Sequence, residues 1–232
     1  MNTKIITLGS IDIPVLLKDI KNVHLSVYPP HGEVRVSAPL KTNLDTLRVY
    51  LSSKITWIKK HQLKFNLQKR VSPREFLTRE SHYIRGQRCL MEVITNSNHC
   101  GVEMDHTSIK LHLKSESDAS KTYQKWQRSE LKKDITTLLQ KWEPEIGVKS
   151  SKFVIRKMKT RWGSCNPVLK TINLNLNLIE KAPEHLEYVV VHELIHLIER
   201  KHNANFVAHM DKFIPNWKQL KSELNSLALT EI

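Results

Sequence analysis

The hydrophobic pattern of the first part of the chain predicts short strands followed by a long helix. Apolar residues alternate with polar ones over short stretches of residues 4–40, and turn-forming residues separate these stretches. Apolar residues then recur at helical spacing and predict a helix over about residues 43–65, carried by Leu44, Leu47, Leu51, Ile55 and Ile58. Residues 71–118 return to strand-like segments that are broken by glycine and asparagine.

A polar stretch at Ser115–Ser120 resembles a connector and predicts a domain boundary. It divides the chain into a β-rich domain at residues 1–118 and a second domain at residues 119–232. In the second domain Thr171–Leu178 alternates without a fault, which predicts a half-buried strand with one face on a core. The other face is polar and carries Thr171, Asn173, Asn175 and Asn177. A final helix is expected after Pro215, with Leu220, Leu224 and Leu227 on its buried face. The sequence therefore predicts an α+β fold, with a mostly antiparallel β region and one long helix in the first domain and a helix packed on a sheet in the second.

The segment from Pro183 to Ile198 predicts an apolar helix that carries the motif H-E-x-x-H. Pro183 suits a first helical position, and the acidic residues that follow suit the positive end of the helix dipole. At roughly 100° per residue, His192 and His196 lie within about 40° of one another and one turn apart. Glu193 lies at the edge of the same face, where it is poorly placed as a ligand and well placed beside a water on a metal ion. A chance match is the alternative, but a buried helix does not carry such groups inward without a partner.

Composition and charge set limits on the class of protein. The chain has 232 residues, 40% of them hydrophobic, and no apolar run approaches the length of a membrane span. Three widely spaced cysteines without a C-x-x-C motif indicate reduced thiols and a cytoplasmic setting. The 37 basic and 23 acidic residues give a net charge of +14, which favours contact with nucleic acid. The basic residues are nevertheless spread along the chain, as is common for solvated surface.

Several segments resemble the YgjP-like zinc metallopeptidases, which are related to the SprT-like group. The resemblance is strong over residues 150–222, where it rests on Met158-Lys-Thr-Arg-Trp-Gly-Ser-Cys165 and Tyr188-Val-Val-Val-His-Glu-Leu-Ile-His196. It is weaker but recognisable at Val34-Arg-Val-Ser-Ala-Pro39 and Trp57-Ile58. It implies a zincin-like domain in which a twisted sheet lies against the active-site helix and an edge strand beside the cleft can bind an extended peptide. The alternating stretch fits that strand, and we expect its polar face at Thr171–Asn177 to pair with an extended chain. The resemblance also implies that His192, His196 and His202 bind Zn²⁺ and that Glu193 is the general base.

The third ligand requires a particular local structure. On a straight helix His202 would lie about 9 Å along the axis from His196 and about 120° around it, too far for one site. We therefore expect the helix to end near Arg200 or Lys201 and the chain to turn back, with Phe206 holding the returning segment. Glu199 is the competing ligand, because it lies on the correct face one turn beyond His196. Three ligands in a row on one helix would diverge, however, and His202 is the favoured assignment.

Four further side chains have less specific roles. Arg161 and Tyr188 are candidates for stabilising a developing oxyanion, although a surface ion pair and helix packing are the commoner roles of such residues. Cys165 is expected to be a small buried hydrophobe rather than a ligand. Glu199, if it is not a ligand, can orient an imidazole or simply lie at an exposed helix end.

The function predicted from these observations is that of a zinc-dependent hydrolase, most simply a metallopeptidase acting on polypeptides. One alternative is a metal-dependent phosphohydrolase acting on nucleoside triphosphates, since the resemblance extends to that activity. A Gly-rich phosphate loop is missing from the sequence, which counts against this alternative. A second alternative is a nucleic-acid-associated binding or protein-processing module, favoured by the positive charge.

Overall fold

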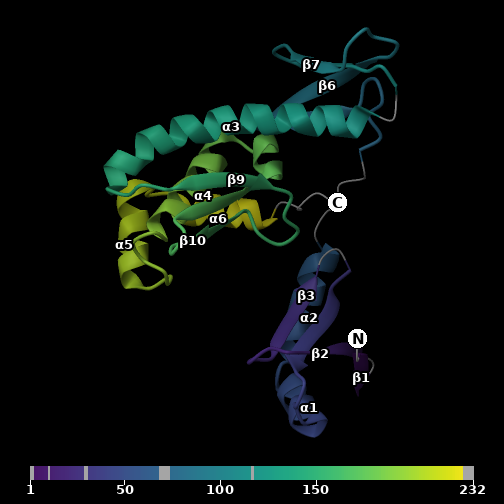
Figure 1. Ribbon diagram of the computed structural model, residues 1–232, viewed down its shortest axis with the longest axis vertical. Coiled ribbons are helices and arrows are strands. Elements are labelled where there is room, and N and C mark those ends of the chain that lie inside the picture. Colours follow the sequence, from purple (N-terminus) through teal and green to yellow (C-terminus); the bar gives the residue numbers. More distant parts are fainter. Residues whose placement is uncertain (1–2, 10, 29–30, 68–73, 116–117, 227–232) are drawn as a thin grey trace. The chain divides into compact units, whose positions relative to one another are not determined.

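The chain forms two compact units, and the division between them falls near residue 70 of the sequence. The computed structural model describes residues 3–9, 11–28, 31–67, 74–115 and 118–226 (Figure 1). Each unit has its own hydrophobic core, and the two cores share no residue among those described. We describe each unit by itself.

The first unit is a four-stranded sheet covered by two helices. The strand order is β1-β2-β4-β3, in which β2 and β4 are parallel and the other neighbours are antiparallel. Alternate residues of the strands point into a core with the helices, as the period of two requires. The elements are β1 Thr3–Leu8, β2 Ile11–Lys18, β3 His24–Tyr28, β4 Glu33–Pro39, α1 Leu44–Ser53 and α2 Ile55–Leu67.

The helix predicted over residues 43–65 is therefore two helices. Asn43 caps the first of them, because its side-chain oxygen accepts hydrogen bonds from the backbone N–H groups of Asp45 and Thr46. The break falls at Lys54, directly after two serines whose hydroxyls donate to the carbonyl oxygens of Arg48 and Tyr50. Hydroxyl groups that compete for helix carbonyls, and serine pairs in particular, favour such a break.

The second unit contains a four-stranded sheet, a long helix and the predicted site. The sheet order is β5-β6-β8-β7, with β6 and β8 parallel. Its buried side chains belong to the same core as α3, which spans Ala119–Ile146 and lies across the rest of the unit (Figure 1). The strands are β5 Ser81–Ile84, β6 Gln87–Ile94, β7 Gly101–Met104 and β8 Ser108–His112.

This arrangement differs from the boundary at 118/119 that the sequence predicts. The strands of residues 81–112 pack against α3, so the division between the compact units lies near residue 70 instead. The polar connector does lead into α3, but it joins two parts of one core. Residues 116–117 of this connector lie outside the described part of the chain.

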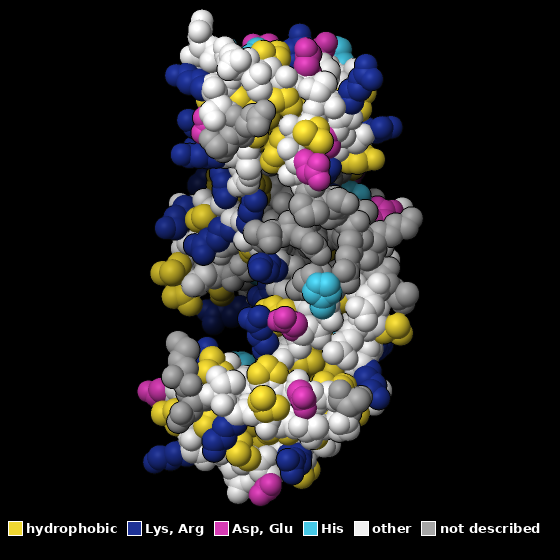
Figure 2. Space-filling view, turned by 90° about the vertical axis from the view of Figure 1, so that its right-hand side faces the viewer, with side chains coloured by type: hydrophobic (Ala, Val, Ile, Leu, Met, Phe, Trp, Pro, Cys, Tyr) yellow, Lys and Arg dark blue, Asp and Glu magenta, His cyan; other side chains and the backbone are white. Residues whose placement is uncertain are grey.

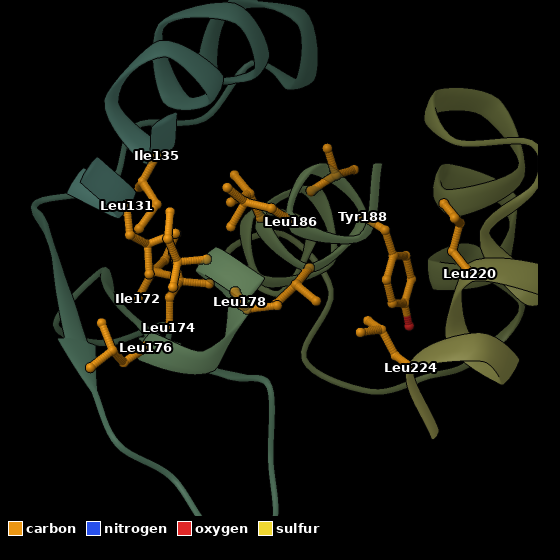
Figure 3. Close-up of a cluster of buried hydrophobic side chains, with 14 of the residues drawn as sticks. Leu131, Ile135, Ile172, Leu174, Leu176, Leu178, Leu186, Tyr188, Leu220 and Leu224 are labelled. Atoms are coloured by element: carbon orange, nitrogen blue, oxygen red, sulfur yellow. The ribbon is translucent and has the colours of Figure 1, made fainter. Parts of the chain in front are cut away.

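A three-stranded sheet and three further helices complete the second unit. The sheet order is β10-β11-β9, antiparallel between β10 and β11 and parallel between β11 and β9. Side chains of β11, α3, α4 and α6 meet in one core, in which Tyr188 lies beside Leu220 and Leu224 (Figure 3). The elements are β9 Lys152–Arg156, β10 Gly163–Asn166, β11 Thr171–Asn175, the 3-10 helix η2 Leu176–Glu180, α4 Pro183–Ile195, α5 Ala204–Phe213 and α6 Trp217–Ser226.

The strand predicted over Thr171–Leu178 is shorter and more buried than expected. It ends at Asn175, after which the chain forms η2, and Thr171 and Asn175 are buried although they were assigned to a polar, solvated face. Because β11 has a neighbour on both sides, its backbone groups are already paired, and it is not the edge strand. The two edge positions belong to β10 and β9, and β10 is the edge strand that passes Glu193 at Gly163.

The observed architecture confirms the predicted α+β class, with mixed sheets where mostly antiparallel pairing was expected. The final helix also lies after Pro215, although Leu227 is outside the described residues. Lys and Arg side chains occupy many separate places on the face shown in Figure 2, with apolar side chains between them. Among the described helices, none combines the length and the apolar character needed to cross a membrane.

Candidate metal centre

Three imidazoles converge at the end of α4. His192 lies in the last turn of the helix, His196 is its C-terminal cap, and His202 comes from the loop before α5. One ring nitrogen of each residue lies within 4.8 Å of one ring nitrogen of both others. Among the described residues, this is the one group of histidine, cysteine and acidic side chains close enough to hold a metal ion together. Glu199, the competing ligand, is not a member of the group.

The chain reaches this arrangement because α4 ends earlier than the sequence predicts. The helix stops at Ile195 rather than near Arg200, and Leu197 and Ile198 donate their N–H groups three residues back to Leu194 and Ile195. Such tight turns satisfy the last carbonyl groups of a helix while they reverse the chain. The apolar character of Leu197 and Ile198 suggested a longer helix, but Ile198 is 49% exposed.

The returning segment is held by α5, which the sequence analysis did not predict as a helix. Asn203 caps α5 through a hydrogen bond from the Phe206 N–H to its side-chain oxygen, 3.0 Å long. The buried ring of Phe206 lies 4.6 to 4.9 Å, centroid to centroid, from all three imidazoles. Phe206 was expected to hold the returning segment. Its ring also packs against all three imidazoles.

The hydrogen bonds of the imidazoles leave their other nitrogens for a ligand. The Nδ1 atom of His196 lies 2.9 Å from the backbone oxygen of Glu199, which leaves its Nε2 atom available to a ligand. The Nε2 atoms of His192 and His202 are 3.0 Å apart. Zinc–nitrogen bonds of about 2.0–2.1 Å at tetrahedral angles place ligand atoms roughly 3.3 Å apart. The chemistry of the three donors and the spacing of this pair are therefore compatible with a zinc ion.

The electrostatics of the histidines favour their neutral, ligating form. Burial, followed by the charges of His196, His202 and Lys221, lowers the pKa of His192 to about 3. Burial and the charges of His196 and Lys221 also lower the pKa of His202. Neutral imidazoles bind metal ions, whereas protonated ones do not. The rings of His192 and His202 are therefore neutral and able to bind a cation near neutral pH.

Glu193 is buried beside the histidines and does not point out to solvent. It is 5% exposed, and its Oε2 atom has no hydrogen-bond partner within the described structure. Burial raises the pKa of its carboxyl group to about 8, although the charge of Arg161 acts in the opposite direction. A nearby cation would lower this pKa. An unpartnered, buried carboxyl oxygen is costly and indicates a group kept for chemistry.

Gly163, the first residue of β10, makes room for this carboxyl group. A Cβ atom at this position would lie 2.5 Å from Oε1 and 2.8 Å from Cγ of Glu193. Atoms cannot approach so closely, so another side chain here would displace Glu193. The sequence analysis included this glycine only in the segment Met158–Cys165 that carries the family resemblance. Its function follows from the packing of β10 against α4, which no local pattern reveals.

Asn175 holds the loop that leads into β10. It is fully buried, and its side-chain amide donates hydrogen bonds to the backbone oxygens of Met158 and Arg161 at 2.8 and 2.9 Å. Its backbone N–H donates to the Trp162 oxygen at 2.9 Å. The loop that carries Arg161 and Gly163 is thereby fixed against the central strand. The sequence analysis placed Asn175 on a solvated face and missed this role, for which a buried asparagine is the signal.

Two hollows meet at the centre and follow the chain on either side of Gly163. One, of about 440 Å³, is lined by Ser164, Cys165 and Pro167 together with Arg200. The other, of about 260 Å³, is lined by Thr160, Trp162, Tyr188 and Lys221, among others. Both hollows share Arg161, Gly163, His192, Glu193 and His202. The centre is thus the middle of an extended depression.

Arg161, Tyr188 and Cys165, the candidates for supporting roles, all line one or both of these hollows. Arg161 lines both hollows, and Tyr188 lines one while its ring packs beside α6 (Figure 3). Burial and the Glu193 charge raise the pKa of Tyr188 to about 12, so its hydroxyl remains a donor. The same two causes raise the pKa of Cys165 to about 11, which keeps the thiol protonated and makes it a poor ligand.

Glu199 acts through its backbone and not its carboxylate. Its backbone oxygen bonds His196, while its side chain accepts a hydrogen bond from the Lys201 N–H and interacts with Asn203 and Asn205. These hydrogen bonds lower the pKa of Glu199 and stabilise the loop. Of the two roles considered for the Glu199 side chain, the orientation of an imidazole is provided instead by its main chain.

Comparison with known proteins agrees with the chemistry of this centre. The model of the YgjP-like family, described as a metallopeptidase domain, matches residues 21–227. Similar solved structures include the metallopeptidase zymogens abylysin of Pyrococcus abyssi and jannalysin of Methanocaldococcus jannaschii. Each is 22% identical over 39% of this chain, which corresponds to 90% and 92% of their own chains, with TM-scores of 0.37 and 0.36. No curated protein matches the chain. Because the family model spans most of the sequence, this chain belongs to the YgjP-like metallopeptidase family.

Proposed function

We propose that this protein is a zinc-dependent metallopeptidase in which His192, His196 and His202 hold the zinc and Glu193 moves the proton. The observation that carries the proposal is the convergence of three ring nitrogens within 4.8 Å beside a buried carboxyl group with an unpartnered oxygen. Three imidazoles suit zinc, and a set of three protein ligands leaves a position open for chemistry. When bound, zinc acts as a Lewis acid that polarises a carbonyl oxygen and makes water more acidic.

Glu193 has the position and environment required of a general base. Its carboxyl group lies on the same helix as two of the histidines, and Oε2 is free to accept a proton. The surroundings that raise its pKa also make it a stronger base than an exposed glutamate. It would take a proton from the attacking water and return it to the leaving amine. Arg161 and Tyr188 remain candidates for donating to the oxyanion.

The free edge of β10 is suited to an extended polypeptide. This strand pairs with β11 on one side, and no described strand pairs with its other side. An extended peptide can add to such an edge through backbone hydrogen bonds, which do not depend on its side chains. The sequence analysis gave this role to residues 171–177, which are not available because β11 is central. β10 passes Glu193 at Gly163 and is therefore the better candidate.

The proposal is tested by an activity panel with metal-stripped and zinc-restored protein. We expect the restored protein to cleave unfolded proteins or peptides and the stripped protein to be inactive, because the Lewis acid is lost. Peptide cleavage is measured by mass spectrometry, and phosphate release from nucleoside triphosphates is measured in parallel. Zinc-dependent release of phosphate without cleavage of any polypeptide would contradict the proposal and favour the phosphohydrolase alternative. Contact with nucleic acid and a cytoplasmic location remain predictions from composition.

A second test concerns the close approach of Gly163 to Glu193. We expect Gly163→Ala to retain zinc and the fold but to lose about tenfold to a thousandfold in kcat, because the new Cβ would displace the carboxyl group. Zinc content and thermal unfolding separate this effect from misfolding. Gly101→Ala is the control for inserting a methyl group at a glycine, since Gly101, like Gly163, has no left-handed φ, and its added Cβ would meet only the His99 side chain, at 3.3 Å. An unchanged kcat in Gly163→Ala would show that Glu193 needs no such space.

A further inference from the structure

The charged side chains that line the two hollows are almost all of one sign. Arg161 is common to both hollows, Arg200 lines the larger one, and Lys221 lines the smaller one. Of the described residues that line either hollow, Glu193 is the one acidic side chain, and it is buried at the middle. A positive charge is therefore present at the centre of the depression and on each side of it.

These basic side chains are not neutralised by neighbouring carboxylates. Basic residues elsewhere form ion pairs, such as Arg85 with Glu130 and Asp134. Within the described structure, by contrast, Arg161, Arg200 and Lys221 have no acidic partner within ion-pair distance. All three are exposed to solvent. They are therefore free to pair with a ligand.

The fields of two of these residues reach the centre itself. Arg161 lines both hollows together with His192, Glu193 and His202, and Lys221 lines the smaller hollow with the same three side chains. Charges that act on the groups at the centre also act on a substrate bound there. The depression is thus an electropositive groove with its reactive groups in the middle.

We propose that this groove selects polypeptides with acidic side chains on both sides of the scissile bond. Arg200 would pair with an acidic side chain in the hollow beside Ser164–Pro167, and Lys221 would pair with one in the hollow beside Thr160–Trp162. This inference rests on the proposed function, since it names the class of polypeptide that the same site accepts. Arg161 lines both hollows and would therefore attract an acidic side chain on either side of the scissile bond.

The geometry of the groove favours an extended chain over a compact anion. Both hollows follow one stretch of backbone, residues 160–167, and they meet at Gly163. A peptide paired with the free edge of β10 would cross Glu193 and place residues in both hollows, because alternate side chains of a strand lie on one face. A nucleotide would be expected to occupy one hollow and the centre.

The test uses full-length Glu193→Gln protein loaded with zinc, so that binding is measured without cleavage. The probes are fluorescently labelled peptides of one length and one alanine-leucine core, whose flanking positions are acidic, the corresponding amides, or lysine. We expect the peptide that is acidic on both flanks to bind about tenfold tighter than its amide counterpart by fluorescence anisotropy. The lysine peptide should bind more weakly still, and added salt should reduce the differences.

Two substitutions and two matched controls locate the effect. In the same background, Arg200→Gln should weaken binding about fivefold for peptides acidic on one flank only, and Lys221→Gln should do so for the opposite flank. Lys201→Gln is the control for Arg200, since it is the next residue and lines neither hollow. Lys218→Gln is the control for Lys221, because both ammonium groups lie 5.5 Å from the Trp217 ring centroid and only Lys221 lines a hollow. Neither control should change the preference.

Failure of this inference is distinct from failure of the proposed function. Equal affinity for acidic and amide peptides, or an effect of both substitutions on the same flank, would overturn the inference. If wild-type protein cleaves amide and lysine peptides as well as acidic ones, the peptidase stands and the selectivity does not. If the acidic peptides bind with the expected preference but are never cleaved, the groove is as proposed and the peptidase proposal fails. Displacement of peptides by a nucleoside triphosphate, weakened in both Arg200→Gln and Lys221→Gln, would reassign these side chains to phosphate.

Discussion

Glu193→Gln protein is expected to keep its zinc and lose peptide hydrolysis. Glutamine has nearly the same shape but cannot accept and return a proton, and general acid–base catalysis contributes typically 10²–10⁴-fold. We therefore expect kcat to fall by about a thousandfold, while zinc content and zinc affinity change little. The carboxyl group is close to the three histidines but is not part of the group that can hold the metal together. Atomic absorption and single-turnover cleavage measure the two quantities.

The matched control for this substitution is Glu184→Gln. Glu184 belongs to the same helix, but it is exposed in the first turn of α4, far along the chain from the histidines. The Glu184→Gln protein should retain both zinc and activity. Joint loss of zinc and activity in Glu193→Gln would show that Glu193 is a ligand or a structural group. Retention of both would show that another group moves the proton.

His202→Ala is expected to weaken zinc binding by about a hundredfold or more, and Glu199→Gln by less than about threefold. Zinc sites with four ligands bind with roughly 10–16 kcal/mol, so one ligand accounts for about 3 kcal/mol. The Glu199 substitution leaves the backbone oxygen that bonds His196 in place, and the exposed carboxylate only stabilises the loop. Competition with a chromophoric chelator measures both affinities.

The reverse ranking would contradict the proposed ligand set. If Glu199→Gln loses zinc and His202→Ala does not, α4 must continue past Ile195 in the metal-bound protein. Asn205→Ala provides a control for disturbing the loop, because Asn205 interacts with the Glu199 side chain and carries no ligand. A large effect in that variant would indicate that the loop, and not a ligand, governs affinity.

Local sequence patterns predicted the elements that depend on near neighbours. The spacing of His192 and His196 follows from helical geometry alone, and a helix with an apolar face at Pro183–Ile195 is observed. The need for the chain to turn before His202 was also predictable, because a straight helix cannot bring that imidazole back. The position of the turn was not, since Leu197 and Ile198 continue the apolar pattern after the helix has ended. The hydrogen bonds of the turn outweigh that pattern.

Local sequence patterns did not predict features that depend on which elements are neighbours in space. The alternation at residues 171–178 identifies a strand but not its neighbours, so it could not show that β11 is central and that β10 is an edge strand. The boundary near residue 118 was predicted from polarity, whereas the packing of residues 81–112 against α3 places the division near residue 70. Strand order and core membership depend on contacts between residues far apart in sequence.

The sequence by itself determined the family, the α+β class and a helix that carries two imidazoles one turn apart, because motif and periodicity are local properties. The tertiary structure alone brought His202 to that helix, buried Glu193 beside Gly163 and placed Arg200 and Lys221 in separate hollows. Distances between side chains of different elements are set by how those elements pack. Packing is decided by the whole core, and no short stretch of sequence records it.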